Sequence, residues 1–92
     1  MIYNLIDEHI RLHGVEQEGI NLISAASTCY KKDFRNKIDI YWNKILHGLS
    51  LIDQKLIFRA SLTCISDIAR NHEHEVVEKI SQVFEILVKY MH

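Results

Sequence analysis

The chain has 92 residues, of which 48% are hydrophobic and 25% are charged, and its formal net charge is -1. This composition is typical of a folded domain and excludes a disordered chain, and the length suits one small unit rather than two independent cores. A net charge near zero gives no electrostatic footprint for nucleic acid, whose binding needs a concentrated basic surface. We therefore expect no direct contact with nucleic acid.

The sequence contains no run of about 20 apolar residues, which a helix needs to cross a bilayer, so no membrane contact is expected. Its first residues lack the basic leader and long apolar core of a signal peptide. Cys29 and Cys64 lie in apolar stretches outside any close-spaced motif. They are predicted to be reduced, buried side chains rather than disulfide partners, as in a protein of the cytoplasm and nucleus.

Apolar residues recur at helical spacing along the whole chain, which has no proline and only three glycines. This pattern predicts an all-α fold. The five predicted helices cover residues 2–12, 15–30, 34–49, 54–70 and 72–91. Gly14 is predicted to end the first helix, and Asp33 and Asn71 to cap the third and the fifth. Ser50 to Asp53 resembles a capping box before the fourth helix.

The second and fourth predicted helices begin roughly forty residues apart, and so do the third and fifth. A period near forty with two helices per unit is the signature of HEAT and armadillo repeats, in which each unit buries its apolar face against its neighbours. The predicted fold is therefore an α-α superhelix of about two and a half HEAT repeats. The predicted units are residues 1–31, 32–71 and 72–92.

The fifth predicted helix has a long apolar face and no sixth helix to cover it. Two explanations remain open: the chain is a fragment of a longer solenoid, or this face packs against another chain. We expect the fragment to self-associate through this helix.

The segment 53–69 reads DQKLIFRASLTCISDIA, with an acidic residue six positions before an arginine. It resembles the HEAT pattern of an aspartate in the turn, a Val-Arg-like pair (here Phe58-Arg59) and a closing Gly-Asp-Ile-Ala-like run (here residues 66–69). Residues 14–18 (GVEQE), followed by an aliphatic helix and Lys32-Asp33-Phe34, resemble one helix junction in the second half of receptors of the importin beta group, which act in nuclear transport. Residues 64–70 (CISDIAR) resemble the next inner helix, so the resemblance is to a HEAT-repeat fragment from that second half. The resemblance covers residues 14–91.

This resemblance implies a non-catalytic scaffold whose odd-numbered helices are outer (convex) and whose even-numbered helices are inner (concave). Inner surfaces of such receptors bind importin alpha, through its basic importin-beta-binding segment, as well as other cargo and the GTPase Ran. Outer helices accept phenylalanines of FG-repeat nucleoporins. The implied role is Ran-dependent protein import into the nucleus. The alternative is a HEAT scaffold of another kind, such as a phosphatase regulatory subunit or a chromosome-organising protein.

Apolar residues of the third and fifth helices are candidates for an FG-peptide slot: Tyr41, Trp42, Ile45, Val83 and Phe84. Tyr41 and Trp42 are neighbours and cannot share one helix face, so one could fill the core while the other reaches the groove. Several such shallow pockets would act together through multivalency. The alternative is that all five residues simply hold the outer helices together.

Four polar residues are candidates for partner contacts on the concave face: Glu16, Gln17, Asp67 and Arg70. An acidic rim at the start of the second helix would attract a basic adaptor segment. Carboxylates at a helix start also complement the helix dipole, so capping explains Glu16 without a partner.

Asp53 and Arg59 are predicted to form an inter-repeat ladder, because adjacent HEAT repeats are joined by charge-assisted hydrogen bonds at these positions. Gly14 and Ile20 stand at the matching positions of the first unit. The ladder is therefore one rung at most.

The run His72-Glu73-His74 invites a zinc hypothesis, but zinc needs three or four convergent ligands and this run supplies only part of a site. A solvated turn between helices is the preferred interpretation. The sequence has no glycine-rich phosphate loop and no nucleophile elbow. We expect no enzymatic activity, no metal and no cofactor.

Overall fold

Residues 2–90, which this computed structural model describes, form seven α-helices and no β-strand. The helices are α1 (Ile2–His13), α2 (Gln17–Cys29), α3 (Lys31–Arg35), α4 (Ile38–Ser50), α5 (Lys55–Asn71), α6 (Glu73–Val76) and α7 (Ile80–Tyr90). The all-α prediction is confirmed, whereas the predicted number of five helices is wrong. Within the described range, no helix has the length and apolar character needed to cross a membrane.

The two additional helices arise because the third and fifth predicted helices are each divided by a tight turn. The backbone amide of Lys37 donates to the carbonyl of Phe34 over 2.8 Å. The backbone amide of Lys79 donates to the carbonyl of Val76, also over 2.8 Å. Neither turn contains glycine or proline, so the sequence gives no break signal there. Apolar spacing also hides the first turn, because Phe34 before it and Ile38 after it are both buried.

Helix boundaries follow the sequence prediction at one end and depart from it at three others. Gly14 has a φ of 75° and its amide bonds to the carbonyl of Ile10 over 2.8 Å, so it ends α1 as predicted. Asp33 lies inside α3 instead of capping a helix. Ser50 belongs to α4 and its hydroxyl donates to the carbonyl of His47, and Asn71 is the last residue of α5.

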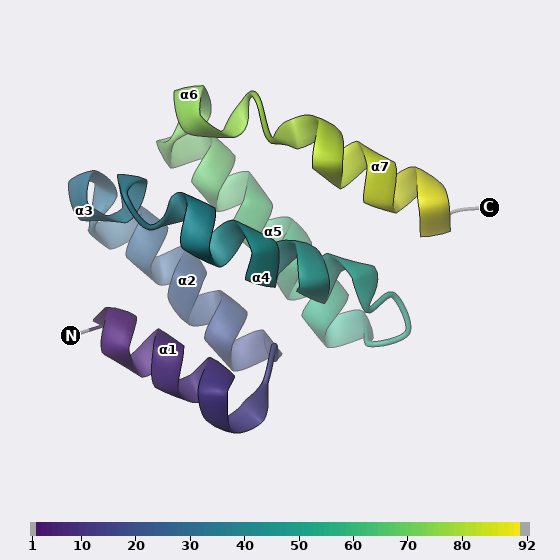
Figure 1. Cartoon of the computed structure of the whole chain (residues 1–92), viewed down its shortest axis with the longest axis horizontal. Helices are drawn as coiled ribbons and strands as arrows, with labels where there is room; N and C mark the ends of the chain where they lie inside the picture. Colours follow the sequence, from purple (N-terminus) through teal and green to yellow (C-terminus); the bar gives the residue numbers. More distant parts are fainter. Residues whose placement is uncertain (1, 91–92) are drawn as a thin grey trace.

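The helices lie in two layers (Figure 1). In one layer α1, α4 and α7 run side by side in the same direction, and in the other α2 and α5 cross behind them. The Cα atoms extend over 40 × 31 × 16 Å, and the smallest extent matches two layers of helices packed 8–10 Å apart. We call these the outer layer (α1, α4, α7) and the inner layer (α2, α5).

Side-chain contacts fix the parallel direction within the inner layer. The hydroxyl of Ser24 on α2 donates to the carboxylate of Asp67 on α5. One turn further along both helices, the side-chain amide of Asn71 donates to the hydroxyl of Thr28. Residue numbers increase from the first contact to the second on both helices, which is possible only when the two helices are parallel. The α2–α5 pair also has the most extensive contact between helices in the described structure.

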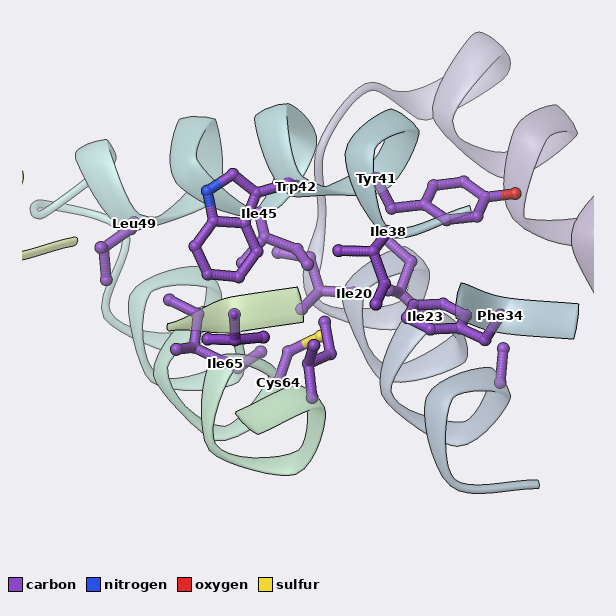
Figure 2. Close-up of a cluster of buried hydrophobic side chains, with 14 of the residues drawn as sticks. Ile20, Ile23, Phe34, Ile38, Tyr41, Trp42, Ile45, Leu49, Cys64 and Ile65 are labelled. Atoms are coloured by element: carbon purple, nitrogen blue, oxygen red, sulfur yellow. The ribbon is translucent and has the colours of Figure 1, made fainter. Parts of the chain in front are cut away.

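The core lies between the two layers and is drawn in Figure 2. Its largest fully buried side chains are those of Tyr41, Phe34, Ile6, Ile20, Ile23, Ile45, Leu49 and Ile68. Cys64 is fully buried as predicted, and desolvation by this burial, with a contribution from Asp67, raises the pKa of its thiol. Cys29 is exposed, which corrects the prediction for that residue, because it follows the last buried turn of α2. Both cysteines are free.

Gly48 allows α4 to approach the inner layer closely. A Cβ at this position would lie 2.8 Å from Cδ1 of Ile20 and 3.3 Å from Cγ2 of Ile57, and it would also overlap Oγ of Ser61. The hydroxyl of Ser61 already donates to the carbonyl of Ile57, so its position is fixed. A side chain at this position would force these groups to shift.

We expect the substitution Gly48→Ala to lower the free energy of unfolding by about 1–2 kcal/mol. Overpacking a tight contact costs about 1–3 kcal/mol, whereas the same change at an uncrowded helix position stabilises by up to about 1 kcal/mol. The measurement is urea unfolding followed by circular dichroism. The variant Gly48→Ala/Ser61→Ala, which removes the nearest obstacle without placing a glycine in α5, serves as the control. Measured against Ser61→Ala alone, it is expected to show a smaller clash cost. A Gly48→Ala variant more stable than the parent would contradict this packing.

Candidate functional site

The predicted FG-peptide slot is closed in the structure. Four of its five residues are in the core, with exposed fractions of 2% for Tyr41, 2% for Trp42, 0% for Ile45 and 5% for Val83, whereas Phe84 is 61% exposed. Figure 2 shows the first three among the core side chains. The slot residues that are buried hold the outer helices together, which corrects the slot hypothesis in favour of its structural alternative.

The two aromatic neighbours on α4 contact different helices of the outer layer, Tyr41 the helix α1 and Trp42 the helix α7. The ring of Tyr41 lies between those of Tyr3 and Phe34, with centroids 6.3 and 6.1 Å away, and its hydroxyl donates to Asp7 on α1 over 2.9 Å. Burial and then the bond to Asp7 raise the pKa of Tyr41. The indole of Trp42 instead donates to Gln82 on α7 over 2.8 Å. Both rings are therefore packed against neighbouring helices and do not form a slot between α4 and α7.

An open groove does exist in the outer layer, but between α1 and α4. It has a volume of about 260 Å³. Its walls are formed by Asp7, Ile10, Arg11, Ile40, Tyr41 and Lys44. Ile40 is 56% exposed and forms the apolar side of the groove on α4. Apolar spacing does not predict this groove, because Ile40 stands outside the apolar stripe of its helix.

The predicted inter-repeat ladder is absent from the described structure. Asp53 lies in the turn between α4 and α5, and Arg59 lies on α5; both side chains are exposed. Neither of them takes part in any ion pair within residues 2–90. The reason is that α2 carries Ile20 where a second arginine would be needed, so the rung has no partner on the neighbouring helix.

The four predicted concave residues lie on the inner layer but form two separate groups. Glu16 and Gln17, at the start of α2, line an open cleft of about 510 Å³ together with the start of α5. The remaining lining residues are Glu18, Asp53, Gln54, Lys55, Leu56 and Ile57. The cleft therefore lies where two parallel helices begin, and three of its side chains are carboxylates.

Asp67 and Arg70 form the second group, near the other end of α5. Asp67 accepts hydrogen bonds from the hydroxyl of Ser24 on α2 and, over 3.1 Å, from the guanidinium of Arg70. The side chain of Asp67 is 22% exposed and that of Arg70 is 73% exposed. Asp67 is thus mainly a joint between the two inner helices, while Arg70 reaches solvent.

Histidines occupy two environments that the sequence did not distinguish. His72 is buried at 3% exposure, with its ring 5.5 Å from that of Phe34 and Nε2 3.3 Å from the carbonyl of Ser27, so the predicted solvated turn is wrong at this residue. His74 is exposed, as a turn residue would be. The two histidines of the His-x-His run are therefore in different environments, one buried and one exposed.

Among residues 2–90, those that come closest to a metal-ligand set are on the α1–α2 hairpin. Nε2 of His9 lies 3.7 Å from Glu16 and 3.9 Å from Glu18, and the three ligand atoms are within 4.8 Å of one another. The side chains of Glu16 and Glu18 are 46% and 78% exposed. One imidazole and two solvent-exposed carboxylates make the minimum set for zinc, and they equally make an ion-pair cluster that closes the hairpin when His9 is protonated.

Comparisons with protein-family models, with curated protein sequences and with solved structures found no match to this chain.

We expect Asp67→Ala to lower the free energy of unfolding by about 1–3 kcal/mol, because it leaves the partly buried hydroxyl of Ser24 without its acceptor. Arg70→Ala is the matched control, since it removes only the exposed side of the same cluster and should cost less than about 1 kcal/mol. The measurement is thermal unfolding of both variants. Adding Ser24→Ala and Ser24→Ala/Asp67→Ala completes a double-mutant cycle, which gives the coupling between the two inner helices. Equal losses for Asp67→Ala and Arg70→Ala would contradict the inter-helix role of Asp67.

Proposed function

We propose that this chain is a HEAT-type helical scaffold that binds segments of other proteins without catalysis. The observation that carries the proposal is the recurrence of one arrangement: α2, α3 and α4 are followed by α5, α6 and α7 in the same order. Inner helices are parallel and outer helices are parallel, as successive units of a repeat protein are (Figure 1). In such arrays the surfaces of the two layers carry the binding sites.

The process in which we place the scaffold is Ran-dependent protein import into the nucleus. Its support is the resemblance of residues 14–91 to the importin beta group, which implies importin alpha or other cargo, Ran and FG-repeat nucleoporins as partners and the cytoplasm and nucleus as location. A HEAT scaffold of another kind, in a phosphatase or in chromosome organisation, is the alternative function for the same fold.

The inner cleft suits a basic segment of a partner. Glu16, Glu18 and Asp53 contribute three negative charges to its lining and Lys55 one positive charge. Glu16 and Glu18 stand at the N-terminal end of α2, and Asp53 lies just before α5. A lysine- or arginine-rich peptide would gain charge-assisted hydrogen bonds here and would be steered by the field of the cleft.

The outer groove between α1 and α4 suits a small apolar or aromatic side chain. Ile10 and Ile40 supply its apolar surface, and the aliphatic parts of Arg11 and Lys44 border it. A groove of about 260 Å³ holds one such side chain and no more, so binding at a single groove would be weak. Weak, repeated contacts summed over several grooves are how FG-type recognition gains strength.

We expect a lysine-rich peptide to bind the inner cleft with an affinity that falls as the salt concentration rises. Glu18→Gln and Asp53→Asn should each weaken binding about two- to fivefold, because each removes one screened surface charge. Glu78→Gln, an exposed carboxylate between α6 and α7, is the matched control and should have no effect. The measurement is isothermal titration at two salt concentrations. Equal binding of a glutamine-substituted peptide would reject an electrostatic cleft.

We expect a Phe-Gly peptide to shift the amide resonances of α1 and α4 at roughly millimolar concentration, as a single shallow pocket allows only weak affinity. The emission of Trp42 should stay unchanged, because its ring is 2% exposed. Ile40→Ser should abolish the shifts and Leu56→Ser, an equally exposed apolar residue on α5, should leave them intact. If no resonance of α1 or α4 moves, the nuclear-transport proposal loses to the alternative scaffold.

A further inference from the structure

The three outer helices have matching positions that can be counted from their first residues, Ile2, Ile38 and Ile80. The fourth residue of each helix is apolar, and so is the fifth. In chain order the fourth residues are Leu5, Tyr41 and Val83, and the fifth residues are Ile6, Trp42 and Phe84. Neighbouring residues of a helix point about 100° apart, so the two sets face different sides. We call them the leading and the trailing positions.

Wherever two outer helices meet, the positions facing each other are buried. At the α1–α4 joint the trailing Ile6 and the leading Tyr41 are 0% and 2% exposed. At the α4–α7 joint the trailing Trp42 and the leading Val83 are 2% and 5% exposed. The two joints therefore use the same pair of positions.

A second contact shows that both joints have the same register. The ammonium of Lys37, the residue before α4, lies 5.5 Å from the ring centre of Tyr3, the second residue of α1. The ammonium of Lys79, the residue before α7, pairs with Asp39, the second residue of α4. One geometric rule thus places each outer helix on the one before it.

At the two edges of the outer layer one member of the pair is exposed. The leading residue of α1, Leu5, is 59% exposed, and the trailing residue of α7, Phe84, is 61% exposed. Each has a second exposed apolar residue on the same helix, Leu12 at 57% and Val88 at 58%. Phe84 and Val88 border an open groove of about 400 Å³. One edge of the layer is the complement of the other.

We propose that a second copy of this chain docks head to tail, with α7 of one copy beside α1 of the next. Phe84 and Val88 would then face Leu5 and Leu12 in the register of the two internal joints. This contact is heterologous, so it leaves a free edge at each end and can add further copies. It does not depend on which partner the scaffold binds.

The joint between copies should be weaker than the internal ones, because only the outer layer continues across it. The side of α2 that points away from the core is polar or small, with Gln17, Asn21, Ala25 and Thr28 exposed. Contact between single helices buries less surface than the roughly 1,200–2,000 Å² of a stable interface. Association should therefore depend on concentration and produce species larger than dimers.

Sedimentation velocity of variants with one blocked edge tests this geometry. Phe84→Glu blocks the trailing edge and Leu5→Glu the leading edge, and both substitutions are at exposed positions, so circular dichroism should show the parent's helix content. We expect each variant alone to be monomeric at concentrations where the parent associates. An equimolar mixture should form 1:1 heterodimers and nothing larger, with a dissociation constant within about threefold of the parent's, because each variant keeps one intact edge.

Three results would overturn the proposal. One is a parent chain that stays monomeric at millimolar concentration. Another is a Leu5→Glu variant that still dimerises while Phe84→Glu does not, since this would mean that α7 pairs with α7. The third is a mixture of the two variants that stays monomeric. Ile40→Glu, at a 56% exposed position on the middle helix, is the matched control and should associate like the parent.

Discussion

The placement of two adjacent aromatic residues on α4 is the constraint on which the rest of the structure depends. Tyr41 and Trp42 point about 100° apart, so a single helix can anchor a neighbour on each side. Tyr41 binds α1 through Asp7, and Trp42 binds α7 through Gln82. Both rings are almost fully buried, and their polar atoms are satisfied by the helices that cover them. The outer layer is therefore organised from its middle helix outwards.

The inner layer is held by a different kind of contact. The α2–α5 pair brings small and polar residues together, and the bond from Ser24 to Asp67 fixes how far one helix is shifted along the other. Gly48 then lets the outer helix α4 sit closely on both inner helices. Large side chains therefore set the distance between helices of the outer layer, while small residues set the distance between the outer and the inner layer.

The sequence predicted the features that depend on local pattern. The all-α class, the end of α1 at Gly14 and the burial of Cys64 all follow from apolar spacing or from backbone freedom. It missed the turns that separate α3 from α4 and α6 from α7, because they contain no glycine or proline and do not interrupt the apolar stripe. Such turns are decided by how the flanking helices pack, which spacing along one helix does not record.

The candidate sites were harder to predict for a related reason. The sequence pattern around an aromatic residue on an outer helix is the same whether the side chain lines a slot or is covered by the next helix. Its exposure depends on whether a neighbouring helix is present. Trp42 and Phe84 hold the same position on their helices, yet one is 2% and the other 61% exposed. The ladder failed likewise, because Asp53 and Arg59 need a matching arginine on α2, where Ile20 stands. Function in this fold therefore depends on which edges and grooves remain uncovered. Among the described residues these include the α1–α4 groove, the inner cleft and the two edges of the outer layer.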